Sequence, residues 1–130
     1  MFVDSSAIVA VLTGEDDADL IAGRIEKAVA PVTSPIAIFE AALGLCRKHH
    51  MTVEEARGDL NEFLELTGIE TVGISPADAD MALLAFSRYG KGRGHPAQLN
   101  MGDCFAYAVA RTREIPLLYK GNDFSQTDIG

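Results

Sequence analysis

Hydrophobic and polar positions along this 130-residue chain follow two different periods. Short, mostly apolar runs at residues 2–3, 31–34, 69–74 and 116–119 are typical of buried strands. Between these runs, apolar residues recur at intervals of three and four, which indicates amphipathic helices. Because strands alternate with helices, the pattern predicts an α/β fold with a parallel sheet and helices on its faces.

Each predicted helix begins at a residue that can bind its free N–H groups or complement its dipole. The expected starts are Asp4 or Ser5, Asp16–Asp17, Ser34–Pro35, Thr52, Ser75–Pro76 and Asp103. In the helix that follows Ser34, the apolar residues Ile36, Phe39, Leu43 and Cys46 are expected to be buried. Residues 89–96 are read as a glycine-rich basic loop.

Composition and charge narrow the class of protein. Hydrophobic residues make up 48% of the chain, and its length suits one folded domain with a core of its own. The net charge of −8 argues against unspecific binding to nucleic acid, although bound divalent cations reverse such a field locally. The two cysteines form neither a disulfide framework nor a zinc motif. With no signal peptide or membrane span recognisable, a cytoplasmic protein is expected.

Four acids stand in places where a carboxylate is costly. Asp4 ends an apolar run, Glu40 flanks the apolar stripe of a helix, Asp103 opens a nearly uncharged helix, and Asp123 follows the last predicted strand. Sites in open parallel sheets form at the carboxyl ends of the strands, so these acids are expected to converge. Carboxylate oxygens suit Mg²⁺ or Mn²⁺, and such a site favours hydrolysis of a phosphodiester.

Each candidate also has an ordinary interpretation. Asp4 alone would be a helix cap, Asp103 a first-turn acid, Glu40 a solvated flank and Asp123 a turn residue. Ser5 is either a cap or a contact to a substrate phosphate. In the basic loop, Lys91, Arg93 and His95 either guide RNA toward the acids or are simply solvated.

The ordered set of motifs resembles a known family. Residues 1–8 (MFVDSSAI) and 34–40 (SPIAIFE) resemble the first two acidic motifs of PIN-domain nucleases. Residues 99–108 (LNMGDCFAYA) and 117–124 (LLYKGNDF) resemble the later motifs of the VapC toxins. The match covers almost the whole chain in the family's order. It implies one domain over residues 1–130, with a three-layer α/β/α fold around a short parallel sheet.

The resemblance also implies an activity, a metal and partners. It implies a metal-dependent endoribonuclease that is the toxin of a type II toxin–antitoxin pair. Asp4 and Asp103 would be the principal Mg²⁺ ligands, with Mn²⁺ as the other candidate metal. Glu40 and Asp123 would complete the site, in part through water, and Asp128 would support it from outside the ligand set. A cognate antitoxin, a homodimer, and a heterotetramer or larger complex with the antitoxin are expected.

Two other functional classes remain open from the sequence. The first is a PIN-like nuclease that processes RNA or cleaves DNA without a toxin role. The second is a non-enzymatic module whose acids bind a basic protein partner. Four intact acids favour an enzyme over the module, and the small size of the chain favours the toxin.

Overall fold

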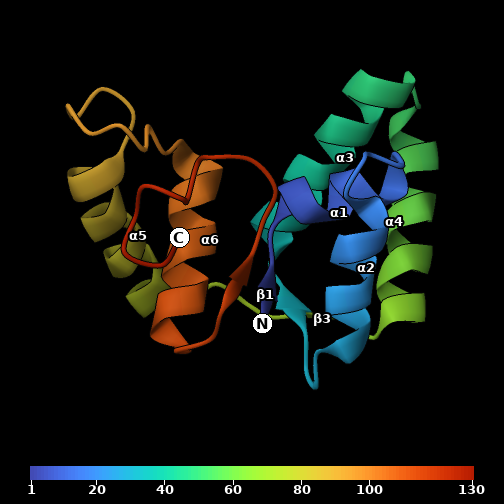
Figure 1. The fold of residues 1–130 in the computed structure, drawn as a ribbon, viewed down its shortest axis with the longest axis horizontal. Coiled ribbons are helices and arrows are strands. Elements are labelled where there is room, and N and C mark those ends of the chain that lie inside the picture. Colours follow the sequence, from blue (N-terminus) through green and yellow to red (C-terminus); the bar gives the residue numbers. More distant parts are fainter.

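The computed structural model describes residues 1–130 and consists of four short strands and six helices (Figure 1). The strands pair in the order β3-β2-β1-β4, and all of them are parallel. The strands are β1 (Phe2–Val3), β2 (Val32–Thr33), β3 (Glu70–Thr71) and β4 (Leu117–Leu118). The helices are α1 (Ser5–Leu12), α2 (Ala18–Lys27), α3 (Pro35–His49), α4 (Val53–Thr67), α5 (Pro76–Tyr89) and α6 (Met101–Thr112).

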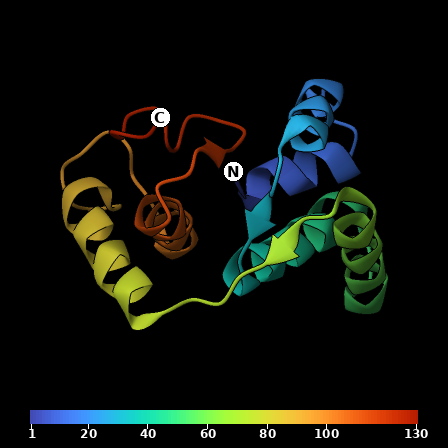
Figure 2. The same cartoon turned by 90° about the horizontal axis from the view of Figure 1, so that it is seen from below.

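The sheet separates two apolar cores. Helices α5 and α6 lie on one side of it, and α1, α2 and α4 lie on the other, as Figure 2 shows. Neighbouring strand residues point to opposite faces, so Phe2 and Leu117 enter the first core while Val3 and Leu118 enter the second. This arrangement confirms the predicted three-layer α/β/α fold.

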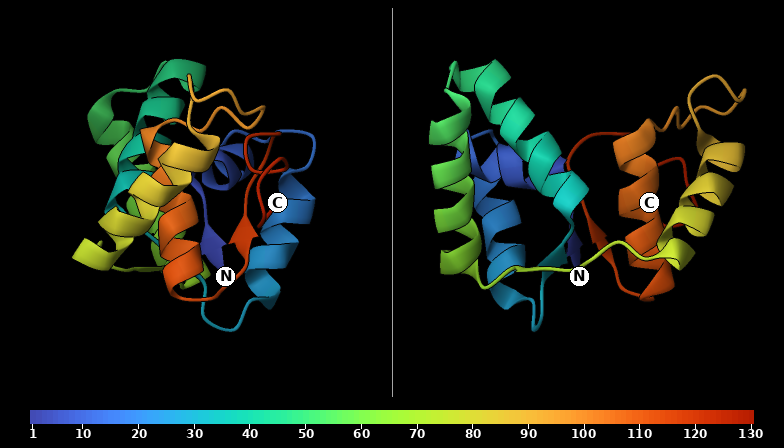
Figure 3. Two further views of the ribbon diagram at one scale, coloured as in Figure 1. Left: turned by 90° about the vertical axis from the view of Figure 1, so that its left-hand side faces the viewer. Right: turned by 180° about the vertical axis from the view of Figure 1, so that it is seen from behind.

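The order of the strands creates a crevice beside β1. The chain leaves β1 toward β2 on one side and returns as β4 on the other, so Phe2 pairs with both Val32 and Leu117. After β3 the chain crosses to the other side of the sheet, where α5 begins (Figure 3). Parallel sheets bind ligands at such a reversal of strand order, outside the carboxyl ends of the strands. Asp4 is the first residue beyond the carboxyl end of β1.

Several predicted element boundaries are confirmed and others are wrong; β2 and β4 are each one residue shorter at both ends than predicted. Ser34, Thr52 and Ser75 cap α3, α4 and α5 as expected. However, α6 begins at Met101 and not at Asp103, because Asn100 caps it. Strand β3 covers only residues 70–71 of the predicted 69–74, since only these two pair with β2.

The buried face of α3 also differs from the prediction. Phe39 and Leu43 were expected inside, but their side chains are 66% and 49% exposed. The small residues Ala37, Ala41 and Gly44 face the interior instead. Helical periodicity identifies an apolar stripe, but only packing decides which part of the stripe another element covers. Here the small residues allow α3 to approach its neighbours closely, since a Cβ at Gly44 would come within 2.9 Å of Val9.

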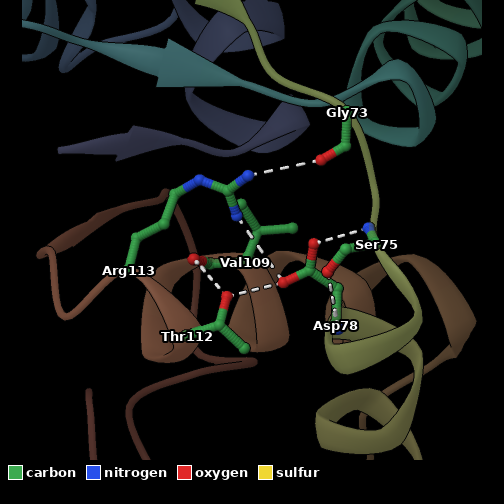
Figure 4. A network of polar contacts seen from close by, with 6 residues as sticks. All are labelled: Gly73, Ser75, Asp78, Val109, Thr112 and Arg113. Carbon is green, nitrogen blue, oxygen red and sulfur yellow. Dashed lines mark hydrogen bonds and ion pairs between the residues drawn. The ribbon is translucent and has the colours of Figure 1, made fainter.

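A buried polar network fixes the connection to α5 (Figure 4). The Asp78 carboxylate accepts hydrogen bonds from the Ser75 backbone N–H and the Thr112 hydroxyl, and Arg113 lies 3.6 Å away. Arg113 also donates to the carbonyl oxygen of Gly73. Burial acts to raise the pKa of Asp78, but these hydrogen bonds and Arg113 hold it below its ordinary value. The network therefore ties the start of α5 to the end of α6.

We expect Asp78→Ala to destabilise the fold by about 2–4 kcal/mol, because it removes a buried acceptor from several donors. Since the pKa of Asp78 is lowered on folding, its contribution is present above the ordinary carboxyl pKa and is lost at more acidic pH. Urea unfolding at neutral pH measures the change. Asp80→Ala, at an exposed position of the same helix, is the control. Equal unfolding free energies for the two variants would contradict the assignment.

None of the six helices has the length and apolar character needed to cross a bilayer.

Candidate active site

One cavity of about 430 Å³ lies at the carboxyl ends of the strands. Its walls include all four predicted acids, Asp4, Glu40, Asp103 and Asp123, together with the predicted Ser5. These residues come from the end of β1, from α1, α3 and α6, and from the loop after β4. The predicted convergence is therefore present in the structure.

Asp4 is held in place by Ser6. The Asp4 carboxylate is only 3% exposed, and its Oδ2 atom accepts from the Ser6 backbone N–H at 3.0 Å and from the Ser6 hydroxyl at 2.6 Å. The Ser6 hydroxyl in turn accepts from the backbone N–H of Lys120 at 3.0 Å. Because an N–H group can only donate, the hydroxyl proton of Ser6 is left for Asp4. Burial nevertheless raises the pKa of Asp4, against these hydrogen bonds.

Asp103 occupies the first turn of α6. Its Oδ2 atom accepts from the Asn100 N–H at 3.1 Å, while the Asn100 side chain accepts from the Asp103 N–H at 2.9 Å. The carboxylate is 8% exposed. Burial raises its pKa to about 7, opposed by the Asn100 N–H and reinforced by the charges of Asp4, Asp123 and Glu40. Both burial and the neighbouring acids therefore oppose ionisation of Asp103.

The Glu40 carboxylate fits against the start of α6 because residue 102 is a glycine and has no Cβ atom. Its carboxylate lies directly on Gly102, where any added Cβ would overlap the carboxylate atoms. The Ser5 hydroxyl donates to Oε1 of Glu40 at 3.5 Å. Burial, followed by the charge of Asp4, raises the pKa of Glu40. Gly102 thus brings the carboxylates of Glu40 and Asp103 to the same helix end.

Asp123 completes the acidic wall from an exposed loop after β4. Its charge contributes to the raised pKa values of Asp4 and Asp103.

Four predicted residues lie elsewhere, among them His95, whose ring packs edge-on against Tyr89 with 4.8 Å between the ring centres. Lys91 and Arg93 belong to the glycine-rich loop after α5, which projects beyond α6 on the side away from β1 (Figure 1, gold), and neither lines the cavity. The Arg93 guanidinium instead lies 5.7 Å from the centre of the Phe86 ring. Asp128 accepts a hydrogen bond from the Tyr107 hydroxyl at 2.7 Å, which fastens the C-terminal segment to α6. Their assignment to RNA binding or to support of the site stays a prediction.

The sequence analysis missed several residues that build this cavity. Ser6 and Asn100 hold two of the acids, and Gly102 makes room for a third. No signal in the sequence marked Gly102, because the helix was expected to begin only at Asp103, whereas Gly102 is the second residue of α6. The cavity also contains basic residues from distant parts of the chain, namely Arg47, Lys48 and Lys120. With Glu15 included, five acidic and three basic side chains line it, a formal charge of −2.

The carboxylate oxygens of the four acids are the type of ligand that a hard divalent cation such as Mg²⁺ prefers. No group of three or more acidic, histidine or cysteine side chains is close enough, as placed, to hold one ion. Mg²⁺ usually takes only one or two protein carboxylates and keeps several waters, so a closed cage is not required. The negative cavity and the raised pKa values of Asp4, Glu40 and Asp103 indicate crowded carboxylates that a divalent cation would relieve.

Comparison with known proteins agrees with this architecture. The PIN domain family model matches residues 1–130. A VapC ribonuclease of Rhizobium meliloti is 41% identical, and the alignment covers 99% of each chain. Ribonuclease VapC of Mycolicibacterium smegmatis is 39% identical, over 99% of this chain and 97% of that protein.

Solved structures share the fold at lower sequence identity. The crystal structure of Mycobacterium tuberculosis VapC20, described as a sarcin-ricin loop cleaving toxin, superposes with a TM-score of 0.76 at 18% identity. That match covers 99% of this chain and 95% of the other. A chain of a toxin–antitoxin complex from Klebsiella pneumoniae gives 0.68 at 17% identity, covering 98% and 92%. The chain therefore belongs to the PIN domain family, in the group whose curated members are named VapC ribonucleases.

Proposed function

We propose that this protein is a metal-dependent endoribonuclease and the toxin of a type II toxin–antitoxin pair. The observation that carries the proposal is the convergence of Asp4, Glu40, Asp103 and Asp123 in one cavity at the reversal of strand order. Full-length relatives named VapC ribonucleases support the activity. The structural relatives described as a toxin and as part of a toxin–antitoxin complex support the toxin role.

In this proposal Asp4 and Asp103 would hold Mg²⁺ or Mn²⁺, and Glu40 and Asp123 would complete the site. A divalent cation supplies Lewis acidity and lowers the pKa of water, which favours attack on a phosphodiester. Glu40, whose pKa is raised by burial, orients the attacking water and accepts its proton. Ser5 and Gly102 fix the direction of that carboxylate. Attack at phosphorus forms the new O–P bond and breaks the P–O3′ bond; the departing O3′ takes a proton from solvent water, which leaves a 3′-hydroxyl and a 5′-phosphate.

Cleavage of total RNA by the purified protein tests the proposal. We expect discrete fragments with Mg²⁺ or Mn²⁺ and none with EDTA. Asp4→Asn should reduce cleavage by more than about 100-fold, since even residues that only support metal ligands contribute about 10- to 100-fold. Asp80→Asn makes the same charge change on an exposed surface and should cleave normally.

The substrate classes are separated in the same experiment. Single-stranded and duplex DNA of matched sequence should remain intact, and their cleavage would favour the DNA nuclease alternative. Cleavage of RNA that persists at full rate in Asp4→Asn would reject the assigned site.

The partners follow from the same proposal. We infer an acidic toxin that acts in the cytoplasm and pairs with an antitoxin carrying an apolar helix and a basic residue. The apolar groove between α2 and α4, lined in part by Ile25, Phe63 and Leu66, is the proposed seat of that helix. The exposed apolar residues Phe39, Leu83 and Met101 suit a homodimer face, and a heterotetramer or larger complex with the antitoxin would follow. Light scattering of the protein, alone and with a candidate antitoxin, measures both assemblies.

A further inference from the structure

Two lysines from distant parts of the chain meet on a single carboxylate in the cavity wall. Lys120 Nζ lies 2.9 Å from Oε1 of Glu15, and Lys48 Nζ lies 3.2 Å from Oε2. Each carboxylate oxygen therefore faces one ammonium group. Glu15 lies in the turn between α1 and α2, Lys48 in the last turn of α3, and Lys120 two residues after β4. All three side chains line the same cavity as the four acids.

This cluster is connected to the proposed catalytic centre. The backbone N–H of Lys120 donates to the Ser6 hydroxyl, which donates to Asp4. Asp17 holds the Lys120 ammonium from a second direction, with 3.0 Å between its Oδ1 atom and Nζ. The basic cluster is therefore anchored next to the first acid of the site. Arg47, on the same turn of α3 as Lys48, lines the cavity and has no acidic partner in the structure.

The geometry is that of an anion site filled by the chain's own carboxylate. Two ammonium groups converge on a group with one negative charge and two oxygens. A phosphodiester of the RNA backbone presents the same charge, and it also has two free oxygens for the same pair of donors. The hydrogen bonds from Lys120 and Lys48 lower the pKa of Glu15, and Glu15 and Asp17 raise the pKa of Lys120, so the Glu15 carboxylate and the Lys120 ammonium are both charged at neutral pH.

We propose that Lys48 and Lys120, with Arg47 beside them, bind the RNA phosphate adjacent to the one that is cleaved. Glu15 occupies this subsite when RNA is absent and competes with RNA for it. The proposal rests on the proposed ribonuclease function for the identity of the ligand. It assigns Glu15 the role of an internal competitor, which limits binding of nucleic acid that does not also engage the acidic centre. A purely structural ion cluster is the alternative.

The two interpretations predict opposite effects of Glu15→Gln on the affinity for RNA. If Glu15 competes with phosphate, Glu15→Gln frees Lys48, leaves Lys120 with Asp17 as its one acidic partner, and tightens RNA binding. If Glu15 only ties α3 to the loop after β4, the same change loosens the lysines and weakens binding. Lys48→Gln and Lys120→Gln should weaken binding in either background, because each removes a phosphate contact.

The test is fluorescence anisotropy of a labelled single-stranded RNA oligonucleotide in EDTA, where no cleavage takes place. We expect Glu15→Gln to bind about 2- to 5-fold more tightly than the wild type, the effect of releasing roughly one exposed ion pair. Each lysine variant should bind more weakly, and the slope of log K against log salt should become shallower by about 0.7. In Glu15→Gln/Lys120→Gln the gain should disappear.

Controls with the same change of net charge separate a local effect from a general one. Glu65→Gln on α4 and Lys27→Gln on α2 are exposed positions outside the cavity. If Glu15→Gln binds no RNA, or binds like Glu65→Gln or more weakly, the proposal is overturned. If both lysine variants match Lys27→Gln, it is overturned as well. Because RNA binding is measured without metal, absence of cleavage with both Mg²⁺ and Mn²⁺ would reject the proposed function, whereas the binding data would still decide the role of Glu15.

Discussion

Asp103→Asn is expected to abolish RNA cleavage and, at neutral or alkaline pH, to stabilise the metal-free protein. The loss of cleavage follows because Asp103 is one of the two proposed metal ligands, and more than about 100-fold is expected. The gain in stability follows from burial and from the neighbouring charges, which raise the pKa of Asp103 to about 7. Asparagine keeps the oxygen that accepts from the Asn100 N–H, so the start of α6 is preserved.

The sign of the pH dependence is set by the raised pKa. Between the ordinary value of 3.8 and about 7, the folded protein holds a proton on Asp103 that the unfolded chain has released. Folding stability of the wild type therefore falls as pH rises through this window, by an amount of order 2–4 kcal/mol. Asp103→Asn lacks this group, so the two proteins should be equally stable near pH 4 and differ most near pH 8.

Thermal unfolding in EDTA from pH 4 to pH 8 measures this difference, and Asp80→Asn is the matched control. Saturating Mg²⁺ should stabilise the wild type more than the variant, because it binds only where its ligands are intact. A variant less stable than the wild type at pH 8 would show that the Asp103 charge is compensated within the protein. The site would then need another explanation than a metal.

Gly102→Ala is expected to displace Glu40 and to lower cleavage by about 10- to 100-fold, since a misplacement of about 1 Å in a reacting group costs this much. The added Cβ would overlap the Glu40 carboxylate, so that side chain or the start of α6 has to move. Overpacking of this kind costs about 1–3 kcal/mol of stability. Steady-state cleavage and urea unfolding measure the two effects.

A second glycine and a double variant make the interpretation specific. An added Cβ at Gly58, in the exposed part of α4, meets no atom within 4 Å, so Gly58→Ala should stabilise the helix by about 0.5–1 kcal/mol without affecting cleavage. In a Glu40→Ala background the clash is absent, and Gly102→Ala should no longer destabilise. Wild-type cleavage by Gly102→Ala, or the same loss of stability in both backgrounds, would contradict the role given to Gly102.

The local signals in the sequence were good predictors of the elements. Capping residues such as Ser34, Thr52 and Ser75 marked helix starts, because a free N–H group needs a nearby acceptor whatever the tertiary context. The prediction for α6 was wrong at its start because Asp103 was read as the first residue, whereas Asn100 and Asp103 bind each other's backbone across one turn. The exposure of Phe39 was missed because periodicity does not reveal which faces meet.

The residues of the site also divide into those that the sequence revealed and those that only the tertiary structure placed there. The four acids were recognisable because a carboxylate in an apolar setting is costly, and the order of strands and helices placed them at one edge of the sheet. The positive side of the cavity was not recognisable. Lys91 and Arg93 looked basic and mobile but lie beyond α6, whereas Lys48 and Lys120 are ordinary surface residues in the sequence. They converge only because the end of α3 and the start of the loop after β4 lie side by side in the fold.

The sequence by itself determined the α/β class, the caps of α3, α4 and α5 and the identity of the acids, since each depends on a residue and its near neighbours in the chain. The tertiary structure decided the rest. It placed Gly102 under Glu40, linked Asp4 to Lys120 through Ser6, and set Glu15 between two lysines. These contacts join residues that are more than 30 positions apart, apart from the step from Asp4 to Ser6. Packing of α3, α6 and the loop after β4 on one edge of the sheet brings them together, and no local pattern records that arrangement.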